Sequence, residues 1–121
     1  MLTLAVVLAA GLGAVARYVL DQVVQHNTTG EFPYGTLLVN TSGSLLLGLT
    51  VGLAIHQGLL PGPAVVVGAG FLGSYTTLST WAYETLALAE SGALLQAVAN
   101  VFGSFAVAAL AASAGLGLAM L

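Results

Sequence analysis

The stretch GFLGSYTTLSTWAYE, residues 70–84, decides how this chain folds. It places Gly70 and Gly73 beside a run of hydroxyl residues, in a segment that is otherwise apolar enough to lie in a membrane. Each glycine weakens a helix by roughly 1 kcal/mol relative to alanine, and an unpaired backbone group in hydrocarbon costs still more. Two interpretations follow. Either the hydroxyls bond to carbonyls one turn earlier while the glycines allow close packing, or the helix breaks beside protein or a wet cavity.

Composition limits the class of protein. The chain has 121 residues, of which 59% are hydrophobic and 4% are charged, and its mean hydropathy is +1.06. Such a chain has too little polar surface for a soluble globule and indicates an integral membrane protein. One arginine and no lysine exclude a nucleic-acid-binding surface, and the absence of cysteine excludes disulfides and thiolate chemistry.

Four stretches are long enough to span a bilayer, which takes about 20 apolar residues each. They cover residues 2–24, 34–55, 64–89 and 92–121, joined by short connections. The sequence therefore predicts an all-α membrane protein with four transmembrane helices in a single domain over residues 1–121. Arg17 is the only Lys or Arg, so the loops carry almost no signal for orientation in the membrane.

Polar residues repeat at helical spacing in the second and fourth stretches. Thr36, Asn40 and Ser44 lie at i, i+4 and i+8, and Asn100 and Ser104 lie four residues apart. A buried amide serves either as glue between helices or as a donor to a ligand. No Asp, Glu or Lys lies at the centre of a predicted span, so the polar groups offered are uncharged donors. Such donors suit a small, strongly hydrated anion that must be bound weakly to pass.

Placing an arginine such as Arg17 within a membrane span costs about 2.5–3.5 kcal/mol of insertion free energy. It follows Gly13 by one turn, and Asp21 lies four residues after it on the same face. On local energetics alone, we expect its side chain to extend toward the interface with Asp21 as a nearby counterion.

Three motifs resemble the Fluc/CrcB family of fluoride channels over nearly the whole chain. GFLGSYTTLSTW, residues 70–81, is similar to the family's third-helix signature GFxGGFTTFSTF. GTLLVNTSGSLLLG, residues 35–48, is similar to GTLxVNxxGSFxxG, and GLGAVARY, residues 11–18, is similar to GxxGAxxRY. The second match is the most specific.

The resemblance implies an antiparallel dual-topology dimer in which the third helix is broken near residues 73–76. It implies two fluoride pathways that export cytoplasmic fluoride passively across the inner (plasma) membrane. A structural sodium ion would lie at the dimer interface, held by the backbone carbonyls of Gly73 and Thr76, and Arg17 would lie near the pore vestibule. The implied fluoride pathway comprises Thr36, Asn40, Ser44, Leu78, Ser79, Thr80, Trp81, Asn100 and Ser104.

The chain departs from the family pattern at aromatic positions. Leu78 and Trp81 replace the two phenylalanines of TTFSTF, Tyr75 replaces the preceding one, and Asn100 stands where the family has a tyrosine. Tryptophan still offers a positive ring edge to an anion, whereas leucine does not. An alternative is therefore a subunit that conducts only with a paralogous partner, or one that does not conduct and serves assembly.

Two other classes have little support. A small multidrug or guanidinium-type transporter would need a membrane-embedded glutamate in the first span, and residues 2–20 contain none. An enzyme is not expected, because His26 and His56 fall in predicted loops with no nucleophile or metal-ligand set nearby.

Overall fold

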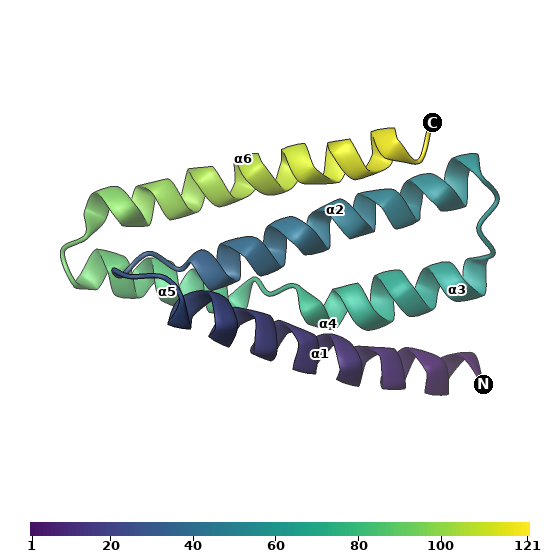
Figure 1. The fold of residues 1–121 in the computed structure, drawn as a ribbon, viewed down its shortest axis with the longest axis horizontal. Helices are drawn as coiled ribbons and strands as arrows, with labels where there is room; N and C mark the ends of the chain where they lie inside the picture. Colours follow the sequence, from purple (N-terminus) through teal and green to yellow (C-terminus); the bar gives the residue numbers. More distant parts are fainter.

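The structure, a computed structural model, describes all residues from 1 to 121 and is entirely helical (Figure 1). Three helices are long and apolar enough to cross a membrane: α1 (Leu2–His26), α2 (Tyr34–His56) and α6 (Leu94–Leu118). The segment between α2 and α6 is divided into α3 (Pro61–Val65), the π-helix η1 (Val66–Leu72), α4 (Gly73–Tyr75) and α5 (Ser79–Glu90). The all-helical membrane class predicted from the sequence is confirmed.

The chain runs back and forth along the long axis of the molecule, so both termini lie at the same end (Figure 1). α2 packs along α6, and α1 packs against η1 and α4. α5 follows the break and packs against the first part of α6. The interrupted segment thus lies between α1 on one side and the α2–α6 pair on the other.

The helix ends differ by a few residues from the predicted spans. The third segment begins at Pro61, three residues before the predicted residue 64. Proline is well tolerated at the first position of a helix, because the N–H that it lacks would have no intrahelical acceptor there. Gly92 lies in the turn after α5 and not in α6. Its φ is +88°, and its N–H and that of Ala93 donate to the carbonyls of Ala89 and Leu88, which closes α5.

The third segment is interrupted just after the glycines. α4 ends at Tyr75, Thr76 is extended with φ −80° and ψ 157°, and α5 begins at Ser79. Gly73 itself is helical, with φ −62° and ψ −31°. The break therefore occupies residues 76–78 and does not use the conformational freedom of Gly73.

Both interpretations of the hydroxyl run hold, each for different residues. The Ser74 hydroxyl lies 2.6 Å from the carbonyl of Ala10 in α1, and the Thr76 hydroxyl donates to the Leu72 carbonyl one turn earlier at 3.0 Å. The Thr76 hydroxyl thus satisfies a carbonyl of its own segment, and the Ser74 hydroxyl connects α4 to α1. The break follows immediately, at the boundary between α4 and α5.

Glycines bring the helices into close contact at two interfaces. A Cβ on Gly13 of α1 would collide with the Phe71 carbonyl oxygen. Between α2 and α6, a Cβ on Gly48 would collide with the Ala112 carbonyl, and one on Gly115 with the Leu45 carbonyl. Backbones that approach this closely are typical of helices packed in membranes.

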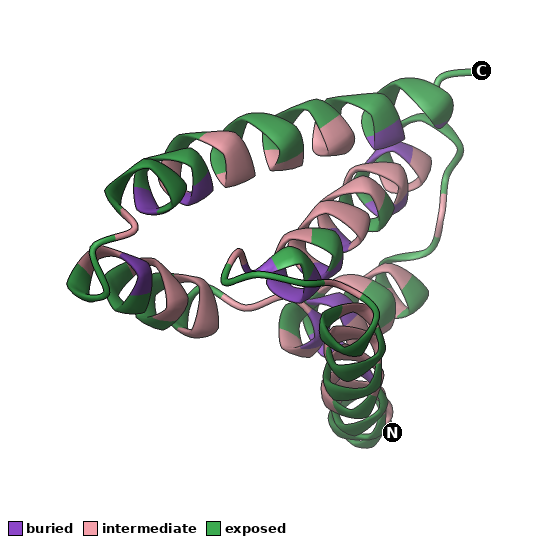
Figure 2. Ribbon diagram, turned by 60° about the vertical axis from the view of Figure 1, so that its left-hand side comes forward, coloured by how far each residue is buried: buried purple, intermediate pink, exposed green.

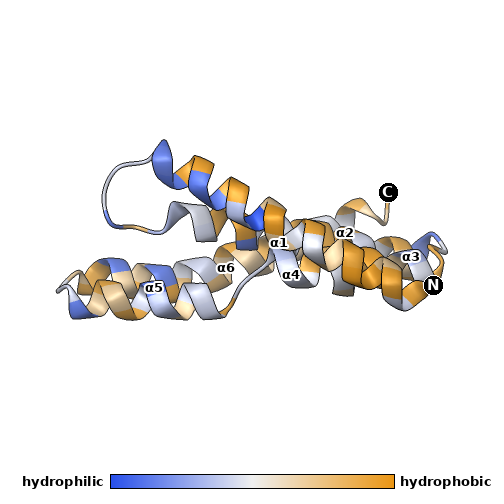
Figure 3. Cartoon of the chain, turned by 90° about the horizontal axis from the view of Figure 1, so that it is seen from below, coloured by the Kyte–Doolittle hydropathy of each residue, from blue (hydrophilic) through white to orange (hydrophobic).

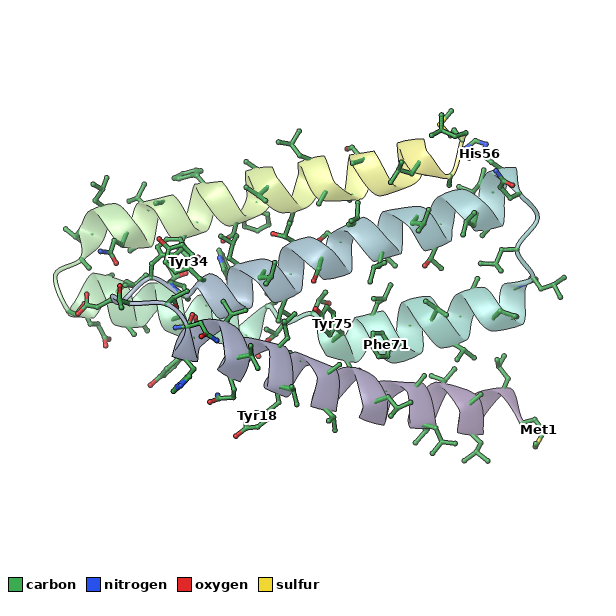
Figure 4. All side chains as sticks on the ribbon, in the orientation of Figure 1. Met1, Tyr18, Tyr34, His56, Phe71 and Tyr75 are labelled. Atoms are coloured by element: carbon green, nitrogen blue, oxygen red, sulfur yellow. The ribbon has the colours of Figure 1, made fainter.

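Little of the chain is buried within itself. The core cluster consists of Val39, Leu72 and Tyr75, and in Figure 4 Phe71 and Tyr75 lie side by side on the α3–α4 stretch. The accessible surface is 7219 Å², against about 6,000 Å² expected for a compact soluble protein of this mass. Figure 2 shows the buried residues where helices face one another. Most of the large apolar residues are exposed.

Hydrophilic residues are not spread evenly over this surface. Figure 3 shows them gathered toward the end of the molecule that holds the α1–α2 loop and α5, while the end with the N-terminus is mostly hydrophobic. An outer surface of this kind needs lipid or another apolar protein surface to cover it.

Candidate functional site

A cavity of about 290 Å³ lies beside the helix break and is the candidate site. Its walls come from α2, from η1 and α4, from the break, from α5 and from α6. No residue that lines it carries a charge. It brings together seven of the residues singled out in the sequence: Asn40, Ser44, Gly73, Thr76, Leu78, Trp81 and Ser104.

Asn40 reaches from α2 to the break and pairs with the backbone of Thr77. Its Nδ2 donates to the Thr77 carbonyl at 2.8 Å, and the Thr77 N–H donates to its Oδ1 at 2.8 Å. Because the backbone fixes which group donates and which accepts, the orientation of the amide is determined. The second N–H of Nδ2 takes no part in this pair.

The break leaves two carbonyls without their helical donors. In a continuous helix the Thr77 N–H would donate to the Gly73 carbonyl, but it donates to Asn40. Likewise the Thr80 N–H, which would serve the Thr76 carbonyl, donates to the Thr77 hydroxyl oxygen at 3.2 Å. Side chains have thus replaced both carbonyls as acceptors.

Most hydroxyls around the cavity are already committed as donors. The Thr76 hydroxyl donates to the Leu72 carbonyl, that of Thr77 to the Thr80 oxygen and that of Ser104 to Oδ1 of Asn100. The Ser44 hydroxyl has no such acceptor in the chain, and it lies one turn after Asn40 on the same face of α2. Uncommitted donors are therefore the Ser44 hydroxyl and the second Nδ2 N–H of Asn40.

Asn100 lies behind the cavity wall. It is 1% exposed, donates from Nδ2 to the Thr85 hydroxyl at 2.7 Å and accepts from Ser104 at 3.0 Å. The backbone carbonyl of Asn100 accepts the indole N–H of Trp81 at 3.2 Å. The Asn100 amide therefore joins α5 to α6 and does not itself line the cavity.

Aromatic rings form another part of the wall. The rings of Trp81 and Phe105 meet edge to face, with centroids 5.3 Å apart and planes at 80°. Both line the cavity, as does Leu78, which is 70% exposed. The indole N–H points to Asn100, so Trp81 presents its ring and not its N–H to the cavity.

A second, smaller cavity of about 110 Å³ holds Arg17, Asp21, Thr36 and Thr80. Thr36 is 3% exposed and donates its hydroxyl to Oε1 of Glu84 at 2.6 Å. The Nε atom of Arg17 is buried and has no hydrogen-bond partner. Thr36, Thr80 and Arg17 are thus grouped apart from the larger cavity.

Ser79 is separate from both groups. It is exposed at the start of α5, where its hydroxyl lies 3.5 Å from that of Thr77. The structure therefore divides the sequence-predicted pathway into a cavity group, a smaller Arg17 group, the buried Asn100 and the exposed Ser79.

Sequence reasoning missed two residues that shape the site. Thr77 belongs to the hydroxyl run, but its role in the break depends on Asn40, which is 37 residues away. Phe105, which lines the cavity, directly follows Ser104 in the sequence. It was not predicted, because the i, i+4 spacing was applied to polar residues only. An aromatic residue next to the polar stripe was the one available signal.

Comparisons with known proteins give a consistent result over most of the chain. The sequence profile of the family described as "CrcB-like protein, Camphor Resistance (CrcB)" matches residues 4–116. The chain is 44% identical over 114 residues to a protein of Leifsonia xyli subsp. xyli named fluoride-specific ion channel FluC 1, covering 91% of this chain and 83% of the relative.

Two further relatives with the same name show similar levels of identity. The protein of Frankia casuarinae is 46% identical over 124 residues, covering 96% of this chain and 94% of the relative. That of Rubrobacter xylanophilus is 46% identical over 107 residues, covering 88% and 84%.

Proposed function

Since the chain belongs to the CrcB-like family, whose named relatives are fluoride-specific ion channels, we propose that it forms a fluoride-selective channel. The family consists of channels and not enzymes. The chain is a membrane protein, with three apolar helices long enough to span a bilayer. In this proposal it exports cytoplasmic fluoride passively across the plasma membrane.

The observation that carries the proposal is the uncharged cavity with two uncommitted donors. Asn40 and Ser44 offer an N–H and an O–H from the same face of α2, and no carboxylate or ammonium group lines the space. A full positive charge would hold a small anion too tightly for conduction, whereas neutral donors replace part of its hydration shell and release it. The rings of Trp81 and Phe105 line the same cavity, and an aromatic ring edge turned toward the anion would add weak positive potential beside these donors.

The remaining candidate residues extend the pathway away from this cavity. Thr80, Thr36 and Arg17 line the smaller cavity, where we place the vestibule; Asp21 lines it too, so its carboxylate partly offsets the positive charge that Arg17 offers an anion. Ser104 lines the main cavity, and Asn100 supports it from behind through that hydroxyl. Leu78 lines the main cavity and is exposed, and Ser79 is exposed next to it in the sequence, so a second copy of the chain would complete the wall there.

An antiparallel dimer suits the position of the break. At about 1.5 Å per residue, the segment before the break is roughly 22 Å long and the segment after it roughly 18 Å, which places the break near mid-membrane. A twofold axis in the membrane plane would therefore bring two breaks to the same depth. Gly73 is exposed there, and a Cβ at this position would meet nothing nearer than the Gly68 carbonyl at 3.6 Å. Its open surface supports close approach by a second copy.

A structural sodium ion fits the carbonyls at the break. Gly73 and Thr76 have lost their helical N–H donors, and small hard cations prefer oxygen ligands. Two copies would offer four such carbonyls. A bound cation would supply positive charge that satisfies them and holds the two chains together.

The proposal is tested by fluoride resistance in bacteria that lack a fluoride exporter of their own. Cells that express this chain should grow at fluoride concentrations that stop the parent strain. Asn40→Asp, which places a carboxylate beside the anion path, should abolish this protection while the protein still reaches the membrane. No protection by the unaltered chain, with normal amounts in the membrane, would contradict the proposal.

A partner-requiring subunit of a heterodimeric channel is the second candidate. Leu78 and Asn100 favour it, because they replace aromatic residues of the family pattern and Leu78 is exposed where a partner would contact it. This candidate predicts protection only when a paralogous subunit is co-expressed.

A further inference from the structure

Asn40 connects the wall of the cavity to the helix break, and we propose that it is a positioning residue for the cation site. Its amide removes the Thr77 N–H from the Gly73 carbonyl and so leaves that carbonyl available as a ligand. The inference rests on the proposed function, in which backbone carbonyls at the break hold sodium.

The diversion of the Thr77 N–H does not arise within the broken segment. The acceptor is Oδ1 of Asn40, in α2. It accepts the Thr77 N–H at 2.8 Å in place of the Gly73 carbonyl. Ser and Thr hydroxyls in residues 70–84 bond to carbonyls of their own segment or α1, or to each other, and none of them takes this N–H. Without the Asn40 side chain, the Thr77 N–H would have the Gly73 carbonyl as its nearest helical acceptor.

The two bonds of the amide act as a clamp on one residue. Because Nδ2 also donates to the Thr77 carbonyl at 2.8 Å, Asn40 fixes the peptide groups on both sides of Thr77. The clamp is built on α2, which is held against α6 through Gly48 and Gly115. A residue of α2, outside the broken segment, thus determines where the break lies.

Asn40 therefore serves both ions of the proposed channel. One N–H and the carbonyl oxygen of its amide hold the break, while the second N–H is not used in that pair and belongs to a residue that lines the cavity. Loss of the amide should weaken sodium binding as well as fluoride passage. Partners that orient metal ligands typically contribute about 10- to 100-fold to metal affinity.

The test is the dependence of thermal unfolding on sodium, measured on the purified chain in detergent with N-methyl-D-glucamine as the replacement cation. Ligands that bind the folded state raise the unfolding temperature as their concentration rises, so the half-maximal sodium concentration reports affinity. Asn40→Ala should need about 10- to 100-fold more sodium than the unaltered chain. Ser44→Ala is the matched control, because Ser44 lines the same cavity but does not bond to the break. Its sodium midpoint should equal that of the unaltered chain.

The possible outcomes separate this inference from the proposed function. A dimer of Asn40→Ala that assembles only at high sodium supports the inference, because mass action compensates a weakened site. The inference is overturned by an unchanged midpoint for Asn40→Ala, by an equal shift for Ser44→Ala, or by failure of Asn40→Ala to assemble at any sodium concentration. An unaltered chain that does not respond to sodium would refute the sodium site itself. Sodium dependence without fluoride passage would refute only the channel.

Discussion

Ser44 is the residue whose hydroxyl is most open to an anion in the cavity. It lies one turn from Asn40 and, unlike the hydroxyls of Thr76 and Ser104, has no acceptor in the chain. Ser44→Ala should lower fluoride flux by about 10- to 150-fold, since a hydrogen bond to a charged group contributes roughly 1.5–3 kcal/mol. Flux from liposomes measures the change, and Ser113→Ala, an exposed serine bonded to its own helix, is the control. Unchanged flux in Ser44→Ala would remove this hydroxyl from the pathway.

Thr85 stabilises the wall behind the cavity. Its hydroxyl accepts from the Asn100 amide and donates to the Trp81 carbonyl, while Asn100 is 1% exposed. Thr85→Val keeps the shape but leaves a buried amide donor unpaired, which should lower the free energy of unfolding by about 1–3 kcal/mol. Thermal unfolding in detergent measures the loss. A variant as stable as the unaltered chain would show that water or lipid reaches Asn100.

Sequence spacing predicted some contacts at this scale and missed others. The i, i+4 spacing of Asn100 and Ser104 correctly brings them into contact, at 3.0 Å, because helix geometry alone decides it. The pairing of Asn40 with Thr77 depends on how two helices pack, which local spacing does not encode. Arg17 and Asp21 share the smaller cavity, as their i, i+4 spacing suggested, yet the buried Nε of Arg17 has no partner.

The long helices were predictable because their lengths follow from apolar stretches and from turn residues. Hydropathy placed α1, α2 and α6 within a few residues of their ends. The resemblance implied a break near residues 73–76, yet the helix continues through Gly73 and stops after Tyr75. The position of the break is set by Asn40 and the Thr77 side chain, and no local signal predicted the π-helix η1 before it.

The contact between α2 and α6 provides a prediction with a matched pair of glycines. Gly115→Ala would drive a Cβ into the Leu45 carbonyl, whereas a Cβ on Gly117, two residues later, meets nothing within 4 Å. Gly115→Ala should lower the free energy of unfolding by about 1–3 kcal/mol, as overpacking does. Gly117→Ala should be neutral or stabilising by up to about 1 kcal/mol, since alanine favours helix. Equal unfolding temperatures for the two variants would contradict the close approach of these helices.

At the scale of the whole molecule, much of the apolar surface is not covered by the chain itself. Its surface exceeds that of a compact soluble protein by about one fifth, and its buried core cluster has only three residues. Hydropathy predicted that lipid would cover part of this surface. Sequence periodicity could not show which part faces a second copy, because lipid and protein contacts are equally apolar.

Dual topology is testable by labelling because the chain has no cysteine of its own. Glu31 lies exposed in the loop between α1 and α2, so Glu31→Cys introduces a single reactive site there. If the chain inserts in both orientations, about half of the copies in intact cells should react with a membrane-impermeant maleimide. Complete labelling or none would indicate one fixed orientation and would favour a paralogous partner.

The most direct test of the channel itself is halide release from liposomes that contain only this purified chain. Ion-selective electrodes would follow fluoride and chloride in parallel, with empty liposomes as the baseline. A fluoride-selective homodimeric channel predicts fast fluoride release and no chloride release. No fluoride release from a folded dimer, or equal release of both halides, would contradict it.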